Sequence, residues 1–119
     1  MRTDSRESGA IGLEDRAQRE AVFGNTLKAK QMAEQGLKLD ASSQGVKVEG
    51  ALAFALAGDT GRAEAMARDL NRRFPLDTQV QLIWLPAIRA QVALNQRKQL
   101  TRYTSWALFY RLRQEIFSS

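Results

Sequence analysis

One ten-residue segment occurs twice in this chain, 34 positions apart. Residues 24–33 align with residues 58–67, and the Gly, Thr, Ala, Met and Ala of the two copies coincide. The same offset places Ala17 on Ala51, so the similarity extends into the helix expected before each copy. A repeat of this length is typical of arrays in which each unit buries its apolar face on the next. The chain is therefore predicted to contain the same helical pair twice.

The second copy has the pattern of an amphipathic helix between two turns. Its apolar residues recur at intervals of three and four, as one face of an α-helix requires. They are Ala63, Met66, Ala67, Leu70 and Phe74. Gly58 suits a left-handed end of the preceding helix, and Asp59 or Thr60 can cap the new helix. Pro75 is expected to end it, because a proline disfavours helical geometry in the residue before it.

The first copy follows the same plan. Asn25 or Thr26 is expected to open its helix, and a polar break at residues 39–43 ends it, with serines that can cap the next helix. Four alanines at matching positions would let paired helices approach closely, while larger apolar residues fill the seam. The alanines are Ala17, Ala29, Ala51 and Ala63, and the larger residues include Phe54, Met66 and Leu70.

The third unit departs from the 34-residue plan. Its first helix is predicted to begin after Asp77 and Thr78, and a turn at Asn95 would make this unit 37 residues long. Pro86 lies inside the helix, where it lacks an amide hydrogen and crowds the carbonyl group of Leu82. A kink or a break is therefore expected at Pro86.

The residues after Gln96 have an apolar pattern of their own. One stripe contains Leu100, Tyr103, Ala107 and Tyr110, with Trp106 and Phe117 beside it, and a second contains Leu108, Leu112 and Ile116. We expect a closing helix that packs on the first helix of the third unit. Two alternatives are a partner-binding or self-association face formed by Tyr103, Trp106, Tyr110 and Phe117, and a basic amphipathic helix on a membrane or nucleic acid.

With Gly58 at the turn between its two helices, the second unit resembles the tetratricopeptide repeat. Its matching slots are filled by Ala51, Phe54, Ala63 and Pro75. The Trp, Leu and Phe of the family pattern are replaced by Lys47, Gly50 and Ala67. The resemblance covers about residues 14–95. Residues 74–90 look similar to tetratricopeptide regions of bacterial regulatory proteins, in which the repeats follow a serine/threonine kinase or winged-helix domain.

This resemblance implies an all-α fold, a short right-handed α-solenoid of antiparallel helix pairs with about six helices. The expected organisation is a flexible N-terminus over residues 1–12 and one repeat domain over residues 13–119. The repeats would span residues 10–43 and 44–77, followed by an irregular third unit and a C-terminal helix over 78–119. First helices line the concave, peptide-binding face of such solenoids. Family geometry places there Gln18, Val48, Leu52, Ala55 and Arg89, of which Arg89 is the cation suited to an acidic ligand.

Much catalytic chemistry is excluded by composition. The chain has no His and no Cys, so it lacks the residues for Ser-His-Asp triads, thiolate nucleophiles and imidazole or thiolate zinc sites. The catalytic-loop and magnesium-binding motifs of a protein kinase are not found either. Glu14 and Asp15 are expected at an exposed helix start, where carboxylates favour the helix dipole. The prediction is a protein without enzymatic activity, cofactor or metal.

Three functional hypotheses remain. The first is a module that binds a peptide or protein. The second is a structural or regulatory segment of a larger kinase or transcriptional regulator that stacks or self-associates through its ends. The third is nucleic-acid or membrane-surface binding by the basic C-terminus, where residues 79–119 contain 6 basic and 1 acidic side chains, net +5. Nucleic acid and membrane are the less favoured partners, because charges of both signs alternate along the two repeats.

A cytoplasmic location is expected from the N-terminal sequence and from the apolar runs. The first nine residues mix both signs of charge and precede no apolar run, unlike a signal peptide. The longest apolar stretch, residues 51–57, is much shorter than the ~18 residues that a membrane-spanning helix needs.

Overall fold

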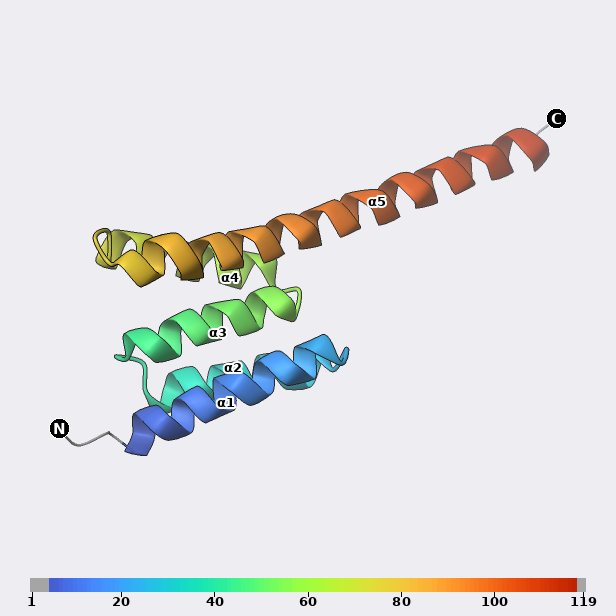
Figure 1. Ribbon diagram of the computed structural model, residues 1–119. Coiled ribbons are helices and arrows are strands. Elements are labelled where there is room, and N and C mark those ends of the chain that lie inside the picture. The colour runs from blue at the N-terminus through green and yellow to red at the C-terminus, as the bar shows by residue number, and fades with distance from the viewer. Residues whose placement is uncertain (1–4, 118–119) are drawn as a thin grey trace.

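The computed structural model describes residues 5–117, and the side chains of residues 5–116. This part of the chain is all-helical and contains no strand. Its elements are α1 (Ser5–Val22), α2 (Thr26–Leu39), α3 (Gln44–Leu56), α4 (Thr60–Arg73), a π-helical turn η1 (Val80–Trp84) and α5 (Leu85–Phe117). We expected about six helices and find five α-helices, because the third unit and the tail form one continuous helix (Figure 1).

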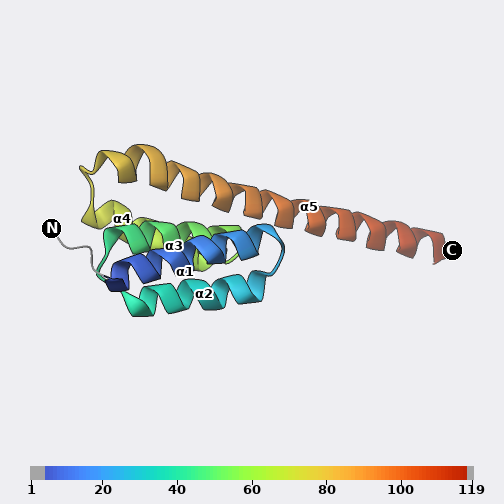
Figure 2. The same cartoon turned by 60° about the horizontal axis from the view of Figure 1, so that its bottom comes forward.

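The helices stack in the order of the chain. α1 packs on α2 and on α3, and α3 packs in turn on α4 and on α5. Figures 1 and 2 show the resulting body, from which the second half of α5 projects alone into solvent. The molecule is consequently elongated, with principal extents of 75 × 30 × 17 Å.

The predicted turns are confirmed. Gly24 and Gly58 adopt φ angles of +91° and +86°, in the left-handed region that favours glycine. The Asp59 side chain accepts a hydrogen bond from the Arg62 amide at 3.3 Å, and Ser43 caps α3 in the same way. At the start of α2, Asn25 does not cap with its side chain, because its amide group donates to Glu20 of the preceding helix.

The alanine seams are also confirmed. All four predicted alanines are fully buried. Phe54 and Leu70 belong to the same core, and Leu85 and Ile88 add α5 to it. Small residues at these positions bring the helix backbones close, so the core depends on a few large side chains to fill the remaining space.

Replacement of Ala63 by leucine is expected to overpack the seam between α3 and α4. The added volume has no free space at this fully buried position, so the free energy of unfolding should fall by about 1–3 kcal/mol. Thermal unfolding followed by circular dichroism would measure the loss. Ala65→Leu on the exposed side of α4 is the matched control, and equal melting temperatures for the two variants would contradict the seam.

The N-terminal boundary differs from the expectation of a flexible segment over residues 1–12. α1 begins at Ser5, while residues 1–4 lie outside the described part. Ala10 is fully buried and continues the small-residue stripe of Ala17 and Ala21. Residues 5–12 are helical because this stripe gives them a face to pack on α2 and α3.

At Pro86, where a kink or a break was expected, the structure has a π-helical turn and no break. The Leu85 amide bonds to the Val80 carbonyl group five residues back, which widens the helix just before the proline. The helix then continues through Asn95, so the prediction of a turn at this residue is wrong. Instead, the Asn95 side chain donates to the Ala55 carbonyl oxygen at 2.7 Å, which also accepts from the Gly58 amide at 3.1 Å, and so links α5 to the end of α3.

Asp77 fastens the start of this third unit to the body. Its carboxylate accepts hydrogen bonds from the Gln44 side chain at 2.9 Å and from the Val80 amide at 3.0 Å. The Gln44 bond is the largest of the effects that lower the pKa of the Asp77 carboxyl group. The contact ties the beginning of α3 to the beginning of η1.

Candidate functional site

The residues predicted to line a concave face do not form one open surface. Val48 and Ala55 are buried in the core, so neither is free to contact a partner. Leu52 packs against the same core and is partly buried. Gln18 is partly buried, and its amide group donates to the backbone and side-chain oxygens of Glu49, at 3.0 and 3.3 Å. These four residues mainly join the helices to one another.

Arg89 is the predicted binding residue that stays exposed. It lies beside a groove of about 320 Å³ between α4 and α5, whose apolar floor includes Ile88 and Val92. Arg68 of α4 lines the same groove, as does Glu64, which accepts a hydrogen bond from Gln96 at 3.2 Å. Two guanidinium groups beside an apolar floor are suited to a short acidic segment.

The projecting part of α5 is the larger exposed surface. The closing helix that we expected to pack on the third unit is instead its straight continuation, so the intended core residues face solvent (Figure 1). They are Leu100, Tyr103, Trp106, Leu108, Tyr110, Leu112 and Ile116, each between 48% and 69% exposed. Phe109, which was not part of the predicted stripes, is exposed with them at 64%. The side chain of Phe117, the fourth member of the predicted aromatic face, lies outside the described side chains.

The projecting helix is apolar on two nearly opposite sides. At 100° per residue, the stripe of Tyr103 and Tyr110 and the stripe of Leu108 and Leu112 point in different directions. Trp106 stacks on Tyr110, with ring centroids 5.4 Å apart and planes 16° from parallel. Apolar stripes on both sides of a helix are normally covered by other protein.

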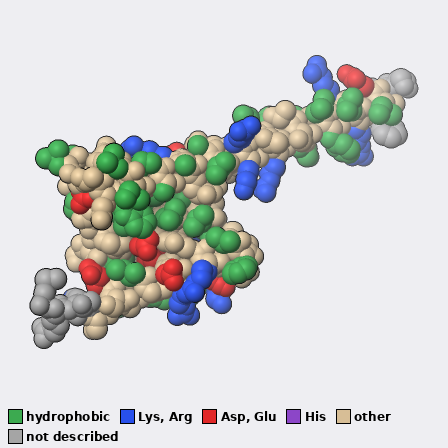
Figure 3. Space-filling view, viewed as in Figure 1, with side chains coloured by type: hydrophobic (Ala, Val, Ile, Leu, Met, Phe, Trp, Pro, Cys, Tyr) green, Lys and Arg blue, Asp and Glu red, His purple; other side chains and the backbone are tan. Residues whose placement is uncertain are grey.

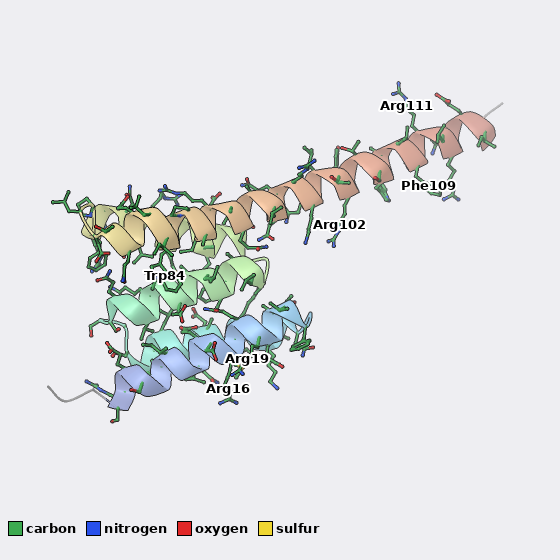
Figure 4. The ribbon with its side chains drawn as sticks, viewed as in Figure 1. Arg16, Arg19, Trp84, Arg102, Phe109 and Arg111 are labelled. Atoms are coloured by element: carbon green, nitrogen blue, oxygen red, sulfur yellow. The ribbon has the colours of Figure 1, made fainter. Side chains whose placement is uncertain are left out.

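Cations separate these apolar stripes. Residues 97–116 contain 5 basic and 1 acidic side chains, net +4. In Figure 4, Arg102 and Arg111 point away from opposite sides of the helix. Figure 3 likewise shows Lys and Arg side chains interspersed with apolar ones along the projection. The surface therefore combines apolar area with positive charge.

The exposed area is large enough for a specific interface. Eight large side chains, each between 48% and 69% exposed, present roughly 900 Å² of mainly apolar surface, divided between the two sides of the helix. A standard protein interface buries about 800 Å² on each partner, whereas the largest apolar patch on a typical monomer is about 300–600 Å². A partner that encloses the projection on both sides would therefore bury an area of standard interface size.

One acidic residue lies in the core, contrary to the expectation from the sequence. Glu14, expected at an exposed helix start, is completely buried on the inner face of α1. It occupies the core stripe of Ala10, Ala17 and Ala21, at helical spacings of four, three and four. That spacing was the signal available in the sequence, since a carboxyl group placed between alanines on one stripe must follow them into the core.

Comparisons with known proteins identify no relative. The chain matches no family model, and it has no significant similarity to any characterised protein or to any solved structure. Within residues 5–116, no group of three or more acidic residues is placed to hold a metal ion. None of the helices described is both long and apolar enough to cross a membrane.

Proposed function

We propose that the chain is a non-catalytic protein–protein interaction module, a short right-handed α-solenoid of tetratricopeptide-like helix pairs that acts in the cytoplasm. The repeated alanine seams and the stacking of α1, α3 and α5 support this arrangement. The free half of α5 is the docking element. The observation that carries the proposal is its apolar surface on two sides, which no other part of the described chain covers.

A partner with an apolar groove fits this element best. A groove encloses a helix on both sides, whereas a flat surface would cover one stripe and leave the other in water. The net charge of +4 over residues 97–116 favours a groove bordered by carboxylates. The groove beside Arg89 offers a second contact for an acidic segment of the same partner.

Substitution of the aromatic stack should remove partner binding without unfolding the body. We expect Trp106→Ser/Tyr110→Ser to abolish retention of proteins that the immobilised wild-type chain captures from a cell extract, because both rings lie in the projecting helix. Deletion of residues 97–119 should have the same effect. Phe23→Ser/Leu76→Ser removes two exposed apolar side chains from the body and is the control. Retention of the same proteins by the tail variant would contradict the docking role.

Self-association through the exposed ends is the second candidate. The roughly 900 Å² of the projection is close to the ~800 Å² that each partner buries in a standard interface. Against this, two copies would bring together helices that each carry a net charge of +4. Size-exclusion chromatography with light scattering separates the candidates, because a monomer at micromolar concentration excludes self-association and a dimer lost in Trp106→Ser/Tyr110→Ser supports it.

A further inference from the structure

The buried carboxyl group of Glu14 lies in a slot between two helices. Gly36 of α2 and Gly50 of α3 form its walls, since a Cβ atom on Gly36 would lie 2.6 Å from Glu14 Oε2 and one on Gly50 would lie 2.9 Å from it. Any larger residue at either position would collide with the carboxyl group. The Glu14 side chain of α1 thus reaches the junction at which α1, α2 and α3 meet.

In the described structure, no hydrogen bond compensates a negative charge on Glu14 at this junction. Neither oxygen of Glu14 has a hydrogen-bond partner. The charged groups that act on it are Glu34 on α2, Glu49 on α3 and Arg62 on α4. Two of these three are like charges, which disfavour the ionised form of Glu14.

The single cation is engaged elsewhere. Arg62 Nη1 lies 2.6 Å from Glu34 Oε1, an ion pair whose geometry is not that of a hydrogen bond. The guanidinium group also lies over the Phe54 ring, 4.7 Å from its centroid. An ionised Glu14 would therefore be a buried charge without a close partner, which is strongly unfavourable.

The physical consequence is that the folded chain holds a proton here. Burial, followed by the charges of Glu49 and Glu34, raises the pKa of Glu14 from 4.5 to about 8, against a smaller opposing effect of Arg62. The folded state binds this proton more tightly than the unfolded state does. Protonation of Glu14 therefore makes its full contribution to the free energy of unfolding below pH 4.5. This contribution is lost as the pH rises through about 8.

We propose that the proton on Glu14 is a structural component of the α1–α2–α3 junction, and that its release loosens the α1–α2 pair from α3. Among the described residues, Glu14 and Ser43 are the buried polar or charged ones, and Ser43 is hydrogen-bonded. The effect of pH is thus localised at the first pair. The packing of α4 and α5 contains no comparable carboxyl group within the described part. The first helix pair is in this way a pH-responsive element, independent of the docking helix.

Thermal unfolding of the full chain between pH 5 and pH 9 tests this proposal. In the wild type the folded-to-unfolded ratio attributable to Glu14 should fall by up to tenfold per pH unit until the pH reaches about 8. Glu14→Gln cannot ionise, so its melting temperature should depend less on pH and exceed that of the wild type at pH 9. Glu7→Gln, elsewhere on α1, is the matched control and should keep the wild-type dependence. Equal pH dependence in Glu14→Gln and wild type would overturn the proposal.

Two measurements cover the case in which Glu14→Gln does not fold. In the wild type, the carboxyl carbon resonance of Glu14 should titrate with a midpoint near 8, and a midpoint near 4.5 would overturn the proposal. Amide hydrogen exchange shows which helices loosen when the pH is raised. Relative to the α4 amides, protection of α1 and α2 should decrease as the pH is raised from 7 to 9, after correction for intrinsic exchange rates. A uniform decrease over all helices would contradict local loosening.

Discussion

Replacement of Phe54 by alanine is expected to lower the free energy of unfolding by about 3–5 kcal/mol. Phe54 is 1% exposed and is the largest fully buried side chain in the described structure. The alanines around it cannot move inward far enough to fill the space, because they have no flexible side chains. The substitution also removes the aromatic face on which the Arg62 guanidinium group lies.

Urea unfolding followed by circular dichroism would measure this effect, with an unchanged dependence on urea concentration as the sign of an unaltered unfolded state. Phe23→Ala is the control, since Phe23 is 80% exposed and its removal should change stability by less than about 0.5 kcal/mol. A loss below about 1 kcal/mol for Phe54→Ala would mean that the core is not organised around this ring.

The second large effect is expected for Ile88→Ala, at about 2–5 kcal/mol. Ile88 is fully buried and lies, with Leu85 and Val92, on the face of α5 that packs against the body. Its loss would leave a cavity under the helix and enlarge the groove beside Arg89. Ile88 therefore both stabilises the third unit and holds the docking helix to the body.

Arg89→Ala provides the comparison at the neighbouring position. Arg89 is exposed, so this variant should unfold within about 0.5 kcal/mol of the wild type while weakening the binding of acidic segments. Ile88→Ala thus tests the stability of the fold, and Arg89→Ala, at the adjacent residue, tests the binding of acidic segments. If Ile88→Ala and Arg89→Ala were equally stable, α5 would not be held to the body by its inner face.

The repeated half of the fold was predictable because its signals are local. A glycine with a following Asp marks a helix end and the next start, and the same 34-residue offset identified the buried Ala51 and Ala63. Each of these inferences uses residues that lie close together in the chain or at one fixed spacing. Tertiary packing then agreed with the local preferences, as expected for a regular repeat.

Other features depended on contacts that a single sequence does not display. A kink or a break was expected at Pro86, and the structure has a π-helical turn just before it, so the helix continues with wider hydrogen bonding at this point. Val48 and Ala55 were assigned to a binding face by analogy with the family, whereas the contacts of α3 with α1, α4 and α5 enclose them. Glu14 was assigned from its charge, although its spacing from the alanines indicated the interior.

The continuity of α5 has a mechanical consequence. Residues 97–117 extend for about 31 Å at 1.5 Å per residue, and the anchored half of the same helix is held by Leu85, Ile88 and Val92. A helix transmits rotation along its length, so a tilt of about 10° at the anchored half would displace the far end by about 5 Å, roughly one helical turn. The helix is thus a lever arm, through which a shift of about 3 Å across the anchored half becomes a movement of about 5 Å at the end that a bound partner contacts.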